Sequence, residues 1–260
     1  LDERFRTPEA SLPSLYRLLG APAEIGLPAN VALLPLPLAE PFDPAALCRP
    51  AAAGRALPIG RHRYTRRGEG DEALLLDGEV LRRCDADLAA TGWARGYLDN
   101  RGAAERFRAL ARPLALARGL APGLAEAGCA PHLVAGASAA APLALELALL
   151  LGARRAVLLS PVFRDRRLHE RLLARVAASP LAVEVYAGSE ERAGPGGGPD
   201  DAERCLLTRA AAFAARLREA GGRARFHEFP GGHDLPAWRS ALLGALREAA
   251  APARRDEAPE

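Results

Sequence analysis

The sequence predicts an α/β protein with a mostly parallel, doubly wound sheet and helices on both faces of that sheet. Short apolar runs alternate along the chain with longer segments whose apolar residues recur at helical spacing. Strands that alternate with helices favour a parallel sheet, because each helix returns the chain to the edge where the previous strand began. The chain of 260 residues, 49% of them hydrophobic, is also long enough for one sizeable core.

Six short apolar runs are predicted to be strands. In chain order they are ALLLDG (73–78), RGYLDN (95–100), HLVAG (132–136), RAVLLSP (155–161), LAVEVYAG (181–188) and ARFHEFP (224–230). Helical spacing of apolar residues predicts helices over 105–128, 139–151 and 200–222, and the last segment ends in the glycine pair expected just past a helix. Active sites in such sheets lie at the carboxyl ends of the strands.

The periodic pattern does not extend over the whole chain. Residues 1–70 are rich in proline and are expected to form a partly irregular amino-terminal extension packed on the main domain. Residues 71–250 are predicted to be one α/β domain. The acidic, alanine- and proline-containing residues 251–260 are expected to be a disordered tail.

Composition argues against several classes of protein. The net charge is only +3, and the arginines, which are the only strongly basic residues, are interleaved with acids, so we expect no nucleic-acid partner. The cysteines form no C-x-x-C pair and no histidine lies at ligand spacing, which predicts reduced thiols and no metal site; they are Cys48, Cys84, Cys129 and Cys205. The first 20 residues lack the apolar core of a secretory signal, and charged residues interrupt every alanine-rich run. We therefore expect a cytoplasmic protein without membrane association.

A single serine lies where a predicted strand turns into a predicted helix. In HLVAGASAAAPLALELALL (132–150), Ser138 is flanked by glycine and alanine, which are small enough for a sharp turn. One interpretation is a helix cap, which serine often provides and which stabilises a helix by about 1 kcal/mol. The other is a nucleophile elbow, in which the turn exposes the hydroxyl and the Ala139 N–H faces a developing oxyanion. The local motif is G-A-S-A-A rather than G-x-S-x-G, so the turn alone leaves both interpretations open.

Chain order favours the nucleophile. A serine hydrolase of this fold class has its acid after a later strand and its histidine later still. Here GSEE follows LAVEVYAG, and GGHD follows ARFHEFP, which makes His233 the candidate base. The other histidines lack a glycine turn after a strand; they are His62, His132, His169 and His227.

Five segments in the same order carry a family resemblance. They are LLLDGE, YLDNRGAAERFRAL, VAGASAAAPLALELALL, VYAGSEE and FPGGHDLPAWRSALLGAL, within residues 73–249, and GGHDLPAWR is the most specific. Together they resemble the enterochelin esterase family of serine hydrolases, which are relatives of esterase D. The resemblance implies an α/β-hydrolase fold and esterase activity without a metal or organic cofactor. It also implies a small-molecule substrate, an ester-linked siderophore such as a catecholate macrolactone or its ferric complex.

The resemblance also implies roles for individual residues. Ser138 matches the nucleophile and His233 the general base, while the backbone N–H groups of Ala139 and Glu79 match the oxyanion donors. Substrate contacts are expected from residues of the R-x-x-E-L and histidine motifs, namely Arg106, Trp238 and Arg239. For Arg106 the alternative is a solvated arginine on a helix face.

The acid of the triad is the most open assignment. By its spacing after the strand Glu191 is the best match and Glu190 the next, whereas Asp200 and Asp201 are displaced by a glycine-rich insertion. A serine–histidine pair without an ordered acid also fits the family. Asp234, next to the histidine, is expected to be structural.

Three departures from the family keep other functions open. Ala140 and Ala141 stand where the family has glycines, Ala109 stands where R-x-x-E-L has glutamate, and 70 residues are too few for the amino-terminal sandwich domain of the larger members. The alternatives are an esterase or lactonase of another secondary-metabolite pathway, or a catalytically inactive hydrolase-like protein that binds a ligand.

Overall fold

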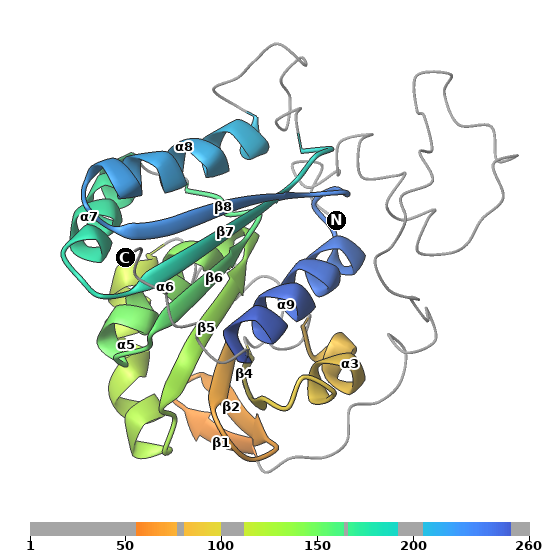
Figure 1. Cartoon of the computed structure of the whole chain (residues 1–260). Helices are drawn as coiled ribbons and strands as arrows, with labels where there is room; N and C mark the ends of the chain where they lie inside the picture. Colours follow the sequence, from red (N-terminus) through yellow and green to blue (C-terminus); the bar gives the residue numbers. More distant parts are fainter. Residues whose placement is uncertain (1–55, 77–80, 100–111, 164–165, 192–204, 251–260) are drawn as a thin grey trace, which may run out of the picture.

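The computed structural model describes residues 56–76, 81–99, 112–163, 166–191 and 205–250 (Figure 1). Several expectations concern positions outside these residues: most of the amino-terminal extension, the carboxyl-terminal tail, and Cys48, Glu79, Arg106, Asp200 and Asp201. Those expectations stay predictions.

The described residues form one eight-stranded sheet in the order β1-β2-β4-β3-β5-β6-β7-β8. The strands are β1 (Ala56–Ile59), β2 (His62–Arg67), β3 (Glu72–Leu76), β4 (Ala94–Asp99), β5 (Pro131–Ala137), β6 (Arg155–Leu159), β7 (Ala182–Gly188) and β8 (Arg223–Phe229). The pairs β1–β2 and β2–β4 are antiparallel, and every other pair is parallel. The mostly parallel sheet and all six predicted strands are therefore confirmed.

Helices cover both faces of the sheet (Figure 1). One face packs against α5 (Pro113–Glu126), α6 (Ala141–Leu150), α7 (Arg166–Ala177) and α8 (Leu206–Glu219). The opposite face packs against α9 (Leu235–Ala250) and a short segment made of the 3-10 helix η4 (Arg82–Cys84) and α3 (Asp85–Ala89). Side chains of a strand alternate between these two cores: in β3, Leu74 faces the first and Leu75 the second.

The antiparallel hairpin β1–β2 is the main difference from the sequence prediction. Residues 56–67 were placed in the amino-terminal extension, yet they extend the sheet beyond β4. The arginine-rich β2 lacks the apolar pattern of a strand. It is stable in the sheet because its arginines pair with carboxylates of other elements. Arg66 lies 3.6 Å from Glu72, and Arg67 donates to Asp85 at 2.8 Å.

Two further findings concern the described helices and cysteines. None of these helices is both long and apolar enough to cross a membrane. Among the described residues the cysteines are free thiols in the core, namely Cys84, Cys129 and Cys205. Burial raises the pKa of the Cys84 thiol to about 12, so this thiol stays protonated at neutral pH.

Candidate active site

Ser138 lies at a strained turn directly after β5. Its φ of 53° falls in the left-handed region, which side chains other than glycine rarely adopt. The chain continues from it through a 3-10 turn (Ser138–Ala140) into α6. Gly136 permits the close approach of strand and helix, because a Cβ there would lie 2.8 Å from the Ala140 carbonyl oxygen and from the Ala144 Cβ. The glycine that this turn needs is therefore on the strand side, and the Ala140 methyl group packs in the core.

The side chain of Ser138 points to a histidine rather than capping the helix. Neither the 3-10 turn nor α6, both within the described residues, has a side-chain hydrogen bond at its cap. Instead Ser138 Oγ lies 2.9 Å from His233 Nε2. This is the distance at which an imidazole can take the hydroxyl proton as the oxygen attacks.

His233 follows β8 in a glycine turn and is exposed, so its ring is accessible to a substrate. Its Nδ1 lies 3.2 Å from Glu191 Oε2. The imidazole and the Trp238 ring pack in a T-shaped arrangement, with 4.9 Å between centroids and 79° between planes. Asp234 begins the next helix, since its carboxylate accepts a bond from the Ala237 N–H at 3.0 Å, the structural role expected for it.

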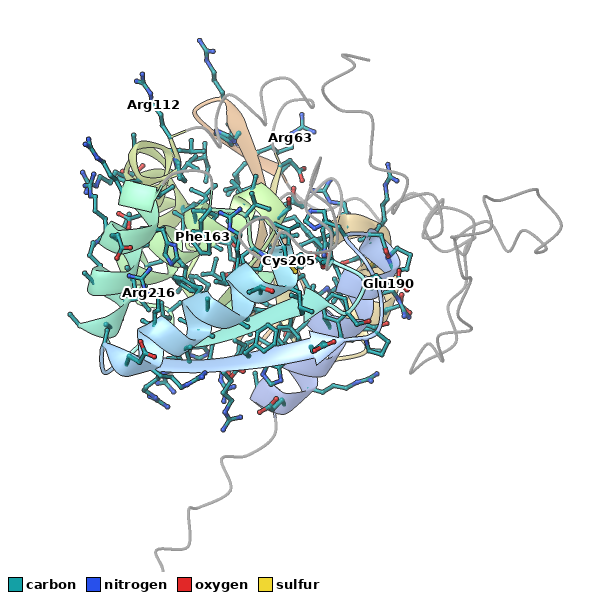
Figure 2. The ribbon with its side chains drawn as sticks, turned by 90° about the horizontal axis from the view of Figure 1, so that it is seen from above. Arg63, Arg112, Phe163, Glu190, Cys205 and Arg216 are labelled. Carbon is teal, nitrogen blue, oxygen red and sulfur yellow. The ribbon has the colours of Figure 1, made fainter. Side chains whose placement is uncertain are left out.

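Glu191 is held in a tight turn after β7. Its carboxylate is buried, and Oε1 accepts hydrogen bonds from the Gly188 N–H, at 2.9 Å, and from the Ser160 hydroxyl. The neighbouring Glu190, half-buried at the same end of the sheet (Figure 2), donates its backbone N–H to the Gly231 carbonyl at 2.9 Å. Of the two glutamates it is Glu191 whose carboxylate contacts His233.

The arrangement contains the parts of a nucleophilic acyl-transfer site. A hydroxyl, an imidazole and a buried carboxylate contact one another in that order at the carboxyl ends of β5, β8 and β7 respectively. Ala139 follows Ser138 in the first turn before α6, where backbone N–H groups have no partner within the helix. Such an N–H is suited to an oxyanion, whereas Glu79, the other predicted donor, lies outside the described residues.

Two residues expected to contact substrate have other partners. The Trp238 indole N–H donates to Ser160 Oγ at 2.8 Å, and its ring packs on the histidine. Arg239 is buried, and its Nε donates to Asp87 Oδ2 on α3 at 2.8 Å. Arg239 therefore joins α9 to α3, and the ion pair compensates the burial of its charge; its contact with substrate stays a prediction.

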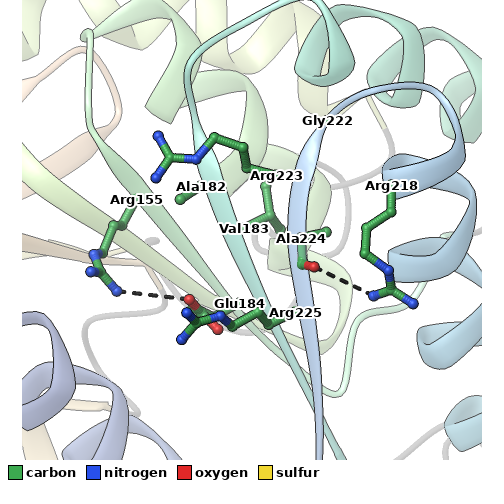
Figure 3. A pocket seen from close by; sticks show the side chains of 9 residues that line it. All are labelled: Arg155, Ala182, Val183, Glu184, Arg218, Gly222, Arg223, Ala224 and Arg225. Carbon is green, nitrogen blue, oxygen red and sulfur yellow. Dashed lines mark hydrogen bonds and ion pairs between the residues drawn. The ribbon is translucent and has the colours of Figure 1, made fainter. Parts of the chain in front are cut away.

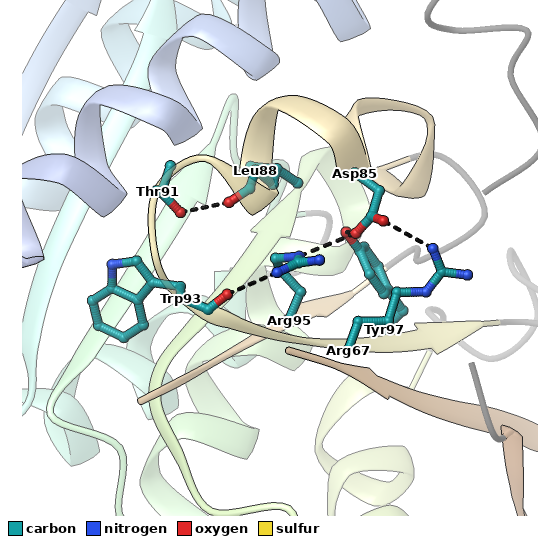
Figure 4. A network of polar contacts seen from close by, with 7 residues as sticks. All are labelled: Arg67, Asp85, Leu88, Thr91, Trp93, Arg95 and Tyr97. Atoms are coloured by element: carbon teal, nitrogen blue, oxygen red, sulfur yellow. Dashed lines mark hydrogen bonds and ion pairs between the residues drawn. The ribbon is translucent and has the colours of Figure 1, made fainter. Parts of the chain in front are cut away.

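A second group of ion pairs holds the same segment at the first residue of α3 (Figure 4). Asp85 accepts hydrogen bonds from Arg67, Arg95 and the Tyr97 hydroxyl. Burial raises the pKa of Asp85, but these bonds outweigh burial and leave the pKa below its ordinary value. The α3 segment, which follows the predicted oxyanion residue Glu79 in the chain, is thus fixed at Asp85 to the sheet and at Asp87 to α9.

Other histidines in the described part of the chain have contacts of a different kind. His132 lies 2.8 Å from Asp71, and His227 Nε2 lies 2.6 Å from Glu184 while its ring stacks on Tyr186. Across the described ranges, no group of histidine, cysteine and acidic side chains has the arrangement of a metal site.

A pocket of about 290 Å³ lies away from these residues (Figure 3). It is lined by Arg155, Ala182, Val183, Glu184, Arg218, Gly222, Arg223, Ala224 and Arg225. The first residues of three strands line it, namely Arg155 of β6, Ala182 of β7 and Arg223 of β8. The pocket is therefore at the amino ends of these strands. Its arginines already contact the protein: Arg218, for example, donates to the Ala224 carbonyl and Arg225 to Glu248. This pocket is therefore separate from the candidate active site.

Comparison with solved structures identifies the fold. The enterobactin esterase of Shigella flexneri in the presence of enterobactin has a TM-score of 0.53 and 20% identity, over 75% of this chain and 57% of that one. In the presence of 2,3-dihydroxy-N-benzoylserine the values are 0.55 and 20%, over 77% and 60%. Esterase 2 of Thermogutta terrifontis, phosphonylated by cyclosarin, has 0.52 and 16%, over 78% and 97%. The chain has an α/β-hydrolase fold.

Comparisons by sequence find no match. No protein-family model matches the chain, and no curated protein sequence matches it significantly. This chain spans about 60% of the length of the Shigella esterase. The likeness confirms the fold that the sequence motifs implied, and a fold alone does not determine activity.

Proposed function

We propose that this α/β-hydrolase is a serine esterase that cleaves an ester or lactone. The observation that carries the proposal is the 2.9 Å contact between Ser138 Oγ and His233 Nε2, made by a serine with a φ of 53°. Backbone strain of this kind costs free energy and is characteristic of functional turns.

The proposed mechanism uses side chains in the order of their contacts. His233 Nε2 takes the hydroxyl proton as Ser138 Oγ attacks the carbonyl carbon, and the negative carbonyl oxygen is bound by the Ala139 N–H. Glu191 orients the imidazole through Nδ1 and stabilises its protonated form. The imidazolium then gives its proton to the leaving alcohol, and water attacks the acyl-enzyme by the same route in reverse.

The proposed substrate is an ester-linked siderophore, such as a catecholate macrolactone or its ferric complex. Support comes from the sequence motifs and from the likeness to an esterase crystallised in the presence of enterobactin. Such a ligand is bulky and its ferric complex is anionic, which suits arginine, a residue that forms paired hydrogen bonds with oxygen anions. Arg106 stays the predicted contact, and a cytoplasmic location stays a prediction as well.

Covalent labelling tests whether the serine is activated. A fluorophosphonate should modify the wild-type protein at Ser138, which peptide mass spectrometry can locate. Ser138→Ala should abolish the modification and His233→Ala should slow it strongly, while the distant Ser179→Ala should react as the wild type does. A folded wild type that is not modified would favour the alternative of a ligand-binding protein without turnover.

A pair of substrates tests the siderophore assignment. We expect wild-type protein to hydrolyse both enterobactin and a small neutral aryl acetate. Arg106→Ala should lower kcat/KM for enterobactin at least about 5-fold, the loss expected for one charged hydrogen bond, and hardly change that for the aryl acetate. Equal losses on both esters would make Arg106 structural. Cleavage of aryl acetate alone would favour an esterase of another pathway.

A further inference from the structure

Ser160 is a second serine with an unusual backbone, directly after β6. In the described part of the chain, Ser138 and Ser160 are the non-glycine residues with positive φ, at 53° and 47°. Glycine adopts this conformation without the steric cost that a Cβ brings. The backbone at position 160 therefore favours glycine, and the feature that serine adds is its hydroxyl.

Ser160 is fully buried, and its hydroxyl both accepts and donates a hydrogen bond. The exposed fraction of Ser160 is 0%, and its backbone N–H donates to the Tyr186 carbonyl at 2.7 Å. Its Oγ accepts the Trp238 indole N–H at 2.8 Å. Because an indole N–H can only donate, the single proton of the hydroxyl is left for Glu191 Oε1, to which Ser160 donates.

These bonds determine which carboxylate oxygen reaches the histidine. Oε1 of Glu191 takes the Ser160 hydroxyl and the Gly188 N–H, so Oε2 is the oxygen directed at His233 Nδ1. A carboxylate that accepts from Nδ1–H keeps the proton on that nitrogen, and Nε2 is then free to accept the proton of Ser138.

We propose that Ser160 is a positioning residue that, with the Trp238 indole N–H, orients the Glu191 carboxylate and through it the His233 imidazole. The contacts form a closed ring: Trp238 to Ser160, Ser160 to Glu191, Glu191 to His233, and the His233 ring back to the Trp238 ring. This inference deepens the proposed function and rests on it for turnover. This closed network contacts the histidine twice, through the carboxylate at Nδ1 and through the T-shaped packing of the indole on the imidazole.

Two substitutions at position 160 separate catalysis from folding. Ser160→Ala removes the hydroxyl and keeps the backbone strain, whereas Ser160→Gly removes the hydroxyl and relieves the strain, so the glycine variant should have the higher Tm. Both should lower kcat for an aryl acetate about 10-fold with KM nearly unchanged, the effect of losing one hydrogen bond to a charged group. The matched control is Ser179→Ala, because Ser179 also makes two hydrogen bonds, to Val176 and Leu181, away from the site. Its kcat should equal that of the wild type.

A double-mutant cycle tests coupling through the carboxylate. Once Glu191→Gln has removed the charge, Ser160→Ala should cause little further loss of kcat, because the hydroxyl then has no carboxylate to orient. Losses that multiply, or kcat values that follow Tm across the alanine and glycine variants, would overturn the proposal and leave Ser160 a structural residue.

A spectroscopic measurement tests the inference independently of turnover. In protein with 15N-labelled histidine, the Nδ1 proton of His233 should give a downfield resonance because it is held against a carboxylate. Ser160→Ala and Trp238→Phe should shift or broaden this resonance, and Ser179→Ala should leave it in place. A wild type without esterase activity but with this response would refute the proposed function and retain the role of Ser160. An unchanged resonance in an active Ser160→Ala variant would refute the role and retain the function.

Discussion

Gly188, at the end of β7, packs so closely on the histidine loop that a methyl group cannot be added there. A Cβ at this position would lie 2.2 Å from the Gly231 carbonyl oxygen and 3.1 Å from Glu191 Oε1. Ordinary contact requires at least about 3.4 Å, so Gly188→Ala must separate the two loops by about 1 Å. The same carbonyl oxygen accepts the Glu190 N–H at 2.9 Å, and that bond would be strained as well.

The consequences of that displacement can be measured separately. Overpacking of this kind costs about 1 to 3 kcal/mol of unfolding free energy, which urea denaturation would report. A 1 Å displacement of the histidine from the serine should lower kcat for an aryl acetate roughly 100-fold. We therefore expect the Gly188→Ala protein to stay folded while its kcat falls roughly 100-fold.

Gly244 provides a control with the opposite sign. It is exposed on α9, and a Cβ there would meet nothing within 4 Å. Gly244→Ala should therefore raise the free energy of unfolding by about 0.5 to 1 kcal/mol, through helix propensity, without changing kcat. If Gly188→Ala kept wild-type kcat and stability, the close packing of these two loops would be wrong.

Three further outcomes are expected. Glu191→Gln should lower kcat roughly 10²- to 10⁴-fold and leave KM nearly unchanged, since the carboxylate acts through His233; a larger loss from Asp201→Asn would instead make that residue the acid. Asp85→Asn should cost about 3 kcal/mol of unfolding free energy at pH 7 by leaving buried guanidinium groups unpaired. Folding lowers the pKa of Asp85, so the ionised carboxylate stabilises the fold fully only above its unfolded pKa of about 4. This stabilisation is lost as the pH falls from that value through the folded pKa. The difference in unfolding free energy between Asp85→Asn and wild type, measured by urea denaturation, should therefore narrow in acid. A constant difference would contradict this reasoning. Arg239→Ala should lower Tm because it breaks the ion pair with Asp87, and leave KM for both enterobactin and aryl acetate unchanged; a selective rise in KM for enterobactin would instead support its predicted contact with substrate.

The sequence predicted the elements whose pattern is local. The parallel strands are continuous apolar runs because both of their faces are buried, and the helices carry a regular apolar stripe. The hairpin β1–β2 could not be recognised in this way. Its arginines are compatible with a strand only because Glu72 and Asp85 neutralise them, and those partners belong to other elements.

The same difference between local patterns and distant partners decides which residues of the site could be predicted. Glycine turns after strands indicated Ser138 and His233, and spacing indicated Glu191, because each is a feature of a few adjacent residues. Ser160 had no such signal: a serine followed by proline after a strand suggests an ordinary turn. Its interest depends on Trp238, which is 78 positions away along the chain. Arg239 is a related case, since the motif that contains it does not reveal its distant partner Asp87.

α9 contacts residues that are distant in the sequence, and this determines when parts of the molecule can fold during synthesis. Trp93 donates its indole N–H to the Leu246 carbonyl at 2.9 Å, and Arg239 pairs with Asp87, contacts that join residues more than 150 positions apart. Until α9 leaves the ribosome, the sheet face that contains Leu75 lacks the helix that covers most of it, and the nascent chain exposes an apolar surface to chaperones and to aggregation. His233 emerges immediately before that helix. The nascent chain therefore acquires its base and covers this apolar face in one step, so a ribosome-bound chain is expected to stay inactive until translation has passed α9.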